Sequence, residues 1–141
     1  MEAPTMFTPV SARAASAYKR VGAQTSIEGA SPHQVICLLF DALLQSLNSA
    51  RGALTRGDME LKGQSISKAV RILEEGLKAA LDVESGGELA VNLRGVYNYS
   101  ILRLTTANLK NDIALIEEVT QLILPVFDAW KSINVPPVGN A

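Results

Sequence analysis

Residues 31–57 read SPHQVICLLFDALLQSLNSARGALTRG and carry the clearest folding signal in this 141-residue chain. Ser31 is a typical helix N-cap, Pro32 suits the first helical position, and Gln34 stands where a capping box takes Glu or Gln. Apolar residues then recur at alternating steps of four and three, at Ile36, Phe40, Leu43, Leu47, Ala50 and Leu54. The spacing predicts one face of a long amphipathic helix that ends near Gly57.

The same rhythm returns in three further segments, each of which follows a capping residue or a turn. Asp58 opens the second segment, a turn over residues 83–87 with two glycines precedes the third, and Asn111-Asp112 precedes the fourth. Their apolar faces are Ile66, Val70, Leu73, Leu77 and Ala80; Leu89, Leu93, Val96, Ser100, Leu104 and Ala107; and Ile116, Val119, Ile123, Val126 and Trp130. Helices of about 20 residues with short connections predict an all-α fold, an antiparallel up-down-up-down four-helix bundle.

The ends of the chain differ from this core. We expect residues 1–17, which hold Pro4 and Pro9, to form a flexible N-terminal arm. The bundle domain is then expected over residues 18–133 and a C-terminal tail over residues 134–141. Pro125 falls inside the fourth segment, where it removes a backbone donor, so we expect a kink or a restart of the helix there.

The composition and charge of the chain exclude several classes of function. Hydrophobic residues make up 48% of the chain and the net charge is −1, which argues against a nucleic-acid partner and against binding to an anionic membrane. The single cysteine suits a reducing compartment. No apolar run approaches the roughly 20 residues of a membrane span, and the N-terminus does not resemble a secretory signal. We therefore expect a cytoplasmic single domain without membrane insertion.

Catalytic and metal-binding patterns are weak. His33 and Cys37 lie four residues apart, but we expect the thiol to be buried and inert and the imidazole to be solvated. With one histidine, the chain cannot supply a di-metal carboxylate site, so we predict no metal, no cofactor and no enzyme activity. Asp41, within an apolar run, is expected either on an exposed stripe or paired with Arg103.

The first and third predicted helices carry more apolar surface than one bundle face requires. Beside their main faces they hold Val35, Leu38, Leu39, Ala42 and Leu44, and Val91, Tyr97, Tyr99, Ile101, Leu102 and Leu109. Two explanations stay open. These helices lie diagonally and are more enclosed, or an apolar groove is left for a partner.

Several ordered pieces of the chain resemble a known family. They are Ala17-Tyr18, Ala30-Ser31-Pro32, Leu39-Phe40-Asp41-Ala42, Lys68-Ala69, Ile72-Leu73, Leu81-Asp82, Gly86-Gly87-Glu88, Asn92-Leu93, Tyr97-Asn98-Tyr99, Ala107-Asn108, Asp112, Glu118-Val119 and Asp128-Ala129-Trp130. In this order they resemble the flagellar secretion chaperones of the FliS family. Phe40 for the usual Tyr, Ala42 for the usual Gly, and Pro125 depart from the family pattern.

The resemblance implies a cytoplasmic export chaperone that is not an enzyme. It would bind the C-terminal region of newly made flagellin, prevent premature polymerisation, and assist delivery to the flagellar type III export apparatus, whose components are further candidate partners. Residues expected to contact the client are Tyr18, Phe40, Leu93, Val96 and Tyr97. We hypothesise that the N-terminal arm covers the client groove until flagellin displaces it. The alternative, a disordered tail with no role, stays open. The rival hypothesis is a structural bundle that self-associates, and a weak homodimer stays open.

Overall fold

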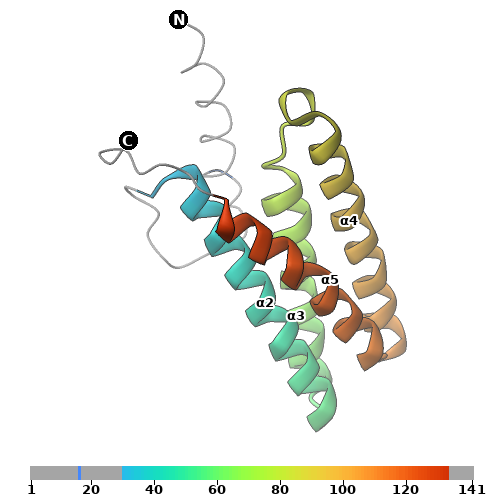
Figure 1. The fold of residues 1–141 in the computed structure, drawn as a ribbon. Helices are drawn as coiled ribbons and strands as arrows, with labels where there is room; N and C mark the ends of the chain where they lie inside the picture. The colour runs from blue at the N-terminus through green and yellow to red at the C-terminus, as the bar shows by residue number, and fades with distance from the viewer. Residues whose placement is uncertain (1–15, 17–29, 134–141) are drawn as a thin grey trace, which may run out of the picture.

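The computed structural model describes residue 16 and residues 30–133. Its elements are the α-helices α2 (Pro32–Arg56), α3 (Met59–Arg71), α4 (Val83–Lys110) and α5 (Ile113–Ser132), with a π-helical segment, η1 (Ile72–Lys78), that continues α3. Successive helices run in opposite directions (Figure 1), as predicted for an up-down-up-down bundle. The expected arm apart from Ser16, the candidate contact Tyr18 and the tail lie outside the described residues.

Local capping chemistry sets the helix boundaries where the sequence predicts them. The Ser31 hydroxyl accepts from the Gln34 amide N–H at 3.1 Å, and the Gln34 side chain accepts from the Ser31 N–H at 2.8 Å. Gly57 ends α2 in the left-handed region with φ 79°, and the Asp58 carboxylate then caps α3 by accepting from Leu61 N. These bonds satisfy backbone groups that a helix end leaves unpaired.

The second predicted helix is less regular than its apolar spacing suggests. Its second half is the π-helical segment η1, in which backbone hydrogen bonds span five residues instead of four. Ile72, Leu73, Gly76 and Leu77 are all buried in this segment. The predicted face included Leu73 and Leu77 but missed Ile72, although Ile72 lies three residues after the buried Ala69 and so shares its side of a regular helix.

The turn predicted over residues 83–87 is only partly right, because α4 already begins at Val83 and Gly87 alone breaks its helical backbone. Gly87 has φ 60° and ψ −137°, a conformation that residues with a side chain rarely adopt. It separates a first turn, capped by the Asp82 carboxylate bonded to Ser85 N, from the long part of the helix. The break lets this long part turn back along η1.

The α5 helix runs without interruption from Ile113 to Ser132, so the restart considered at Pro125 does not occur. Pro125 lies on the exposed side of the helix, and Gln121, whose carbonyl loses its usual partner, is also exposed to water. Phe127, which the predicted face omitted, is buried, and its ring stacks on Phe40 at 5.0 Å.

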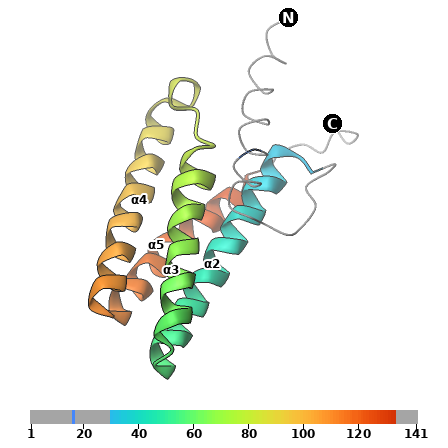
Figure 2. The same cartoon turned by 180° about the vertical axis from the view of Figure 1, so that it is seen from behind.

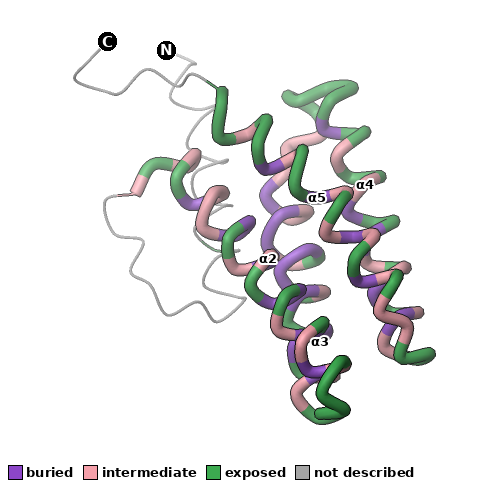
Figure 3. Tube along the Cα trace, turned by 60° about the horizontal axis from the view of Figure 1, so that its bottom comes forward, coloured by how far each residue is buried: buried purple, intermediate pink, exposed green. Residues whose placement is uncertain are grey.

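The four helices form a square in which α2 and α4 are diagonal. Each of them packs against α5 and against α3 with η1, whereas α2 and α4 do not pack against each other within the described residues. Seen from behind, α3 lies between them (Figure 2). The buried positions of the trace lie where the helices come together (Figure 3). The diagonal explanation is thus confirmed, but enclosure holds mainly for α2, because α4 exposes Leu102 and Leu109.

Candidate functional site

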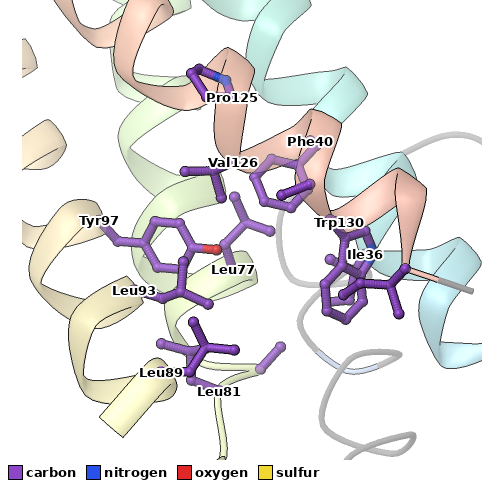
Figure 4. Close-up of a pocket in the computed structure, with 13 residues that line it drawn as sticks. Ile36, Phe40, Leu77, Leu81, Leu89, Leu93, Tyr97, Pro125, Val126 and Trp130 are labelled. Carbon is purple, nitrogen blue, oxygen red and sulfur yellow. The ribbon is translucent and has the colours of Figure 1, made fainter.

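An apolar pocket of about 440 Å³ opens at one end of the bundle (Figure 4). Its described lining is Ile36, Phe40, Leu77, Ala80, Leu81, Leu89, Leu93, Tyr97, Pro125, Val126, Ala129, Trp130 and Ile133. All of these side chains are aliphatic or aromatic, and none carries a charge. A pocket of this kind offers a partner the burial of apolar surface and little electrostatic recognition.

Antiparallel topology brings the four walls of this pocket together. The N-terminal part of α2 and the C-terminal part of α5 form one side, and η1 with the N-terminal part of α4 forms the other. On α4, Leu89, Leu93 and Tyr97 follow one another at steps of four and therefore share one face of the helix. Leu89 is 66% exposed and lies at the rim, in contrast to its predicted place in the core.

A reciprocal link between His33 and Trp130 joins α2 to α5 beside the pocket. The two rings stack with centroids 4.9 Å apart. His33 Nε2 lies 2.8 Å from the Trp130 carbonyl oxygen, and the Trp130 indole N–H donates to the His33 carbonyl at 3.2 Å. The expectation of a solvated His33 was wrong, because α5 returns to cover the first turn of α2. This link fixes the Trp130 wall of the pocket.

Cys37 is half-buried instead of fully buried, and its Sγ lies 4.0 Å from His33 Nδ1. Burial is the main cause that raises the pKa of the Cys37 thiol, and the nearby Asp41 raises it further. A raised pKa leaves little thiolate near neutral pH, which is the opposite of what a catalytic cysteine needs. The geometry therefore favours a structural thiol.

Asp41 lies on the exposed stripe of α2, the first of the two places considered for it. Arg103 pairs instead with Glu118, with Nε 2.8 Å from the carboxylate. The Tyr99 hydroxyl donates to the other oxygen of Glu118. These two hydrogen bonds lower the pKa of Glu118 and tie α4 to α5 on their outer surface.

Three of the residues predicted as client contacts line the pocket, namely Phe40, Leu93 and Tyr97. Val96 is half-buried next to the core and is not among the described lining residues. The α5 wall was missed as a site, although Val126 and Trp130 belonged to the predicted apolar face of the last helix. Their position at the C-terminal end of that helix was the signal, because up-down-up-down topology places it beside the start of α2.

The described part of the chain thus defines a class of protein, a small all-helical bundle with an open apolar pocket. None of its described helices combines the length and apolar character that a membrane crossing requires. A family model for the flagellar protein FliS matches residues 14–136. The chain belongs to the FliS family.

Curated relatives agree over most of their length. The flagellar secretion chaperone FliS of Salmonella typhimurium is 48% identical over 84% of this chain and 87% of its own. The flagellar secretion chaperone FliSB of Pseudomonas aeruginosa is 43% identical over 86% and 96%. The Escherichia coli FliS is 39% identical over 89% and 93%. The family is one of chaperones and not of enzymes, which confirms the prediction of no enzyme activity and does not favour the self-associating alternative.

Proposed function

We propose that this chain is a cytoplasmic export chaperone for flagellin. It binds the C-terminal region of newly made flagellin, keeps it from polymerising, and assists its delivery to the flagellar type III export apparatus. The observation that carries the proposal is the open pocket of about 440 Å³ with a wholly apolar and aromatic lining, in a chain whose relatives are named flagellar secretion chaperones.

The pocket suits a client whose apolar surface must be hidden before assembly. An exposed apolar patch on a folded protein usually marks a binding surface. Grooves between helices typically receive the apolar face of an amphipathic helix, with side chains spaced three and four residues apart as anchors. Phe40, Leu93 and Tyr97 supply three such contacts from two diagonal helices. A flagellin helix bound against these three residues would have its apolar face covered, and that face would then be kept from joining one flagellin subunit to another.

Mixing the purified chain with flagellin monomer tests the proposal. Light scattering after size exclusion is expected to show a stable one-to-one complex. The control is flagellin that lacks its C-terminal region, which is expected to elute apart from the chaperone. Equal binding of both forms would place the contact elsewhere on flagellin. A homodimer of the chain that ignores flagellin would support the self-associating alternative.

A further inference from the structure

The Tyr97 hydroxyl is the only polar side-chain group that the described pocket lining leaves without a hydrogen bond. Tyr97 is 3% exposed, and its oxygen points into the pocket, toward Leu77 and away from α4 (Figure 4). The other polar group of the described lining, the Trp130 indole N–H, already donates to His33. Burial alone raises the pKa of Tyr97 far above its ordinary value, so the hydroxyl keeps its proton.

The Tyr97 hydroxyl is not among the fully buried unpaired polar atoms of the described residues, where only Ser100 Oγ is found, so water in the pocket can reach it. Leaving it unpaired when a client fills the pocket would cost free energy, because the client also expels water from the hydroxyl. A client that brings its own acceptor avoids this cost. The acceptor is neutral, because no described lining residue carries a charge that would compensate a buried carboxylate.

The scarcity of polar groups also limits the conformation of the client. An extended segment would carry unpaired backbone N–H and C=O groups into a pocket whose described lining offers one free donor. A helix pairs these groups internally. An acceptor within a helix must then come from a side chain. Ser and Thr hydroxyls also accept, but in a helix they turn back to the carbonyl four residues earlier, as Thr105, Thr106 and Thr120 do here, and stay close to the helix backbone. The carbonyl oxygens of Asn and Gln are the neutral acceptors that reach out from a helix.

We propose that Tyr97 determines client specificity by donating its hydroxyl hydrogen to the side-chain carbonyl of an Asn or Gln on the apolar face of a helical flagellin segment. This inference rests on the proposed function and adds a polar requirement to it. A client helix with a purely apolar face would fill the pocket but bind less tightly. The pocket therefore distinguishes flagellin from other amphipathic helices by one hydrogen bond.

Tyr97→Phe tests the inference because it removes the hydroxyl and keeps the ring. Calorimetry with flagellin monomer is expected to show binding about tenfold weaker than for the parent chain, while thermal unfolding stays equal or rises. The matched control is Tyr99→Phe. Tyr99 lies on the outer surface of the same helix with its hydroxyl on Glu118, so its affinity for flagellin is expected to equal that of the parent.

A double-mutant cycle identifies the acceptor. Each Asn in the C-terminal region of flagellin is replaced by Leu and each Gln by Met, and affinity is measured against the parent and Tyr97→Phe. One replacement is expected to weaken binding to the parent about tenfold and to leave binding to Tyr97→Phe unchanged.

Full affinity of Tyr97→Phe would overturn the inference and leave the proposed function standing. A loss in Tyr97→Phe that no amide replacement reproduces would also overturn it. If the parent chain itself fails to bind flagellin, the proposed function is wrong and the inference fails with it.

Discussion

Replacing Ser100 by Ala is expected to stabilise the protein. Ser100 lies on the core side of α4, is fully buried, and its hydroxyl has no hydrogen-bond partner. Threonines in α4 and α5 behave differently, because Thr105, Thr106 and Thr120 each donate to the carbonyl four residues earlier. The Ser100 hydroxyl thus has the desolvation cost of burial without the compensating bond.

The size of the gain follows from two contributions. Removing an unpaired buried hydroxyl recovers about 1 kcal/mol or more, and Ala is the better helix former by about 0.5 kcal/mol. Together they raise the free energy of unfolding by about 1.5 kcal/mol. For a chain of this length that corresponds to roughly 5 °C in Tm.

Urea unfolding followed by circular dichroism measures this change as a higher midpoint at an unchanged m-value. The opposite-sign control is Ser65→Ala. Ser65 is also buried, but its hydroxyl lies 2.9 Å from that of Ser49 on α2, so its loss is expected to destabilise. If Ser100→Ala destabilises by a similar amount, the Ser100 hydroxyl is hydrogen-bonded in solution and the reasoning is refuted.

Three further predictions concern other parts of the molecule. Cys37→Ala is expected to lower the free energy of unfolding by about 1 kcal/mol without changing flagellin affinity. Burial raises the pKa of the Cys37 thiol, so in the parent chain at pH 8 this thiol should react with iodoacetamide more slowly when the chain is folded than when it is unfolded in urea. Lys62→Met should lower the free energy of unfolding, measured in urea, by about 2 kcal/mol. The reason is that the buried Lys62 ammonium donates to the Asn108 backbone carbonyl at 3.0 Å and to the Asn108 side-chain oxygen at 2.8 Å. Unchanged stability would mean that water replaces both bonds. Hydrogen bonds lower the pKa of Glu118 below 4.5 in the folded state. The parent chain should therefore be more stable than Glu118→Gln above pH 4.5, and this advantage should shrink as the pH falls below 4.5. A stability difference between the two chains that does not change with pH would contradict the pairing.

Local signals in the sequence predicted the helices and their ends well. Ser31, Asp58 and Asp112 cap the helices where expected, since a cap depends on residues only two or three positions away. The π-helical segment escaped prediction because the apolar spacing of Leu73 and Leu77 is that of a regular α-helix.

The pocket was only partly predictable. Phe40, Leu93 and Tyr97 were expected from the resemblance, and Tyr97 also belonged to the surplus apolar surface. The α5 wall depends on how the last helix lies against α2. That placement rests on a contact between His33 and Trp130, which are 97 residues apart in sequence. Spacing within one helix carries no information on such a contact.

Two similar leucines on α4 allow the most direct test of the binding pocket. Leu89 is 66% exposed at the pocket rim, and Leu102 is 62% exposed but is not among the described lining residues. Asp at either position removes similar exposed apolar surface, so Leu89→Asp and Leu102→Asp should fold with similar stability. Calorimetric titration with flagellin monomer is expected to show at least about tenfold weaker binding for Leu89→Asp and parent-like binding for Leu102→Asp. Equal affinities for the two variants, or a loss confined to Leu102→Asp, would contradict the assignment of this pocket as the client site.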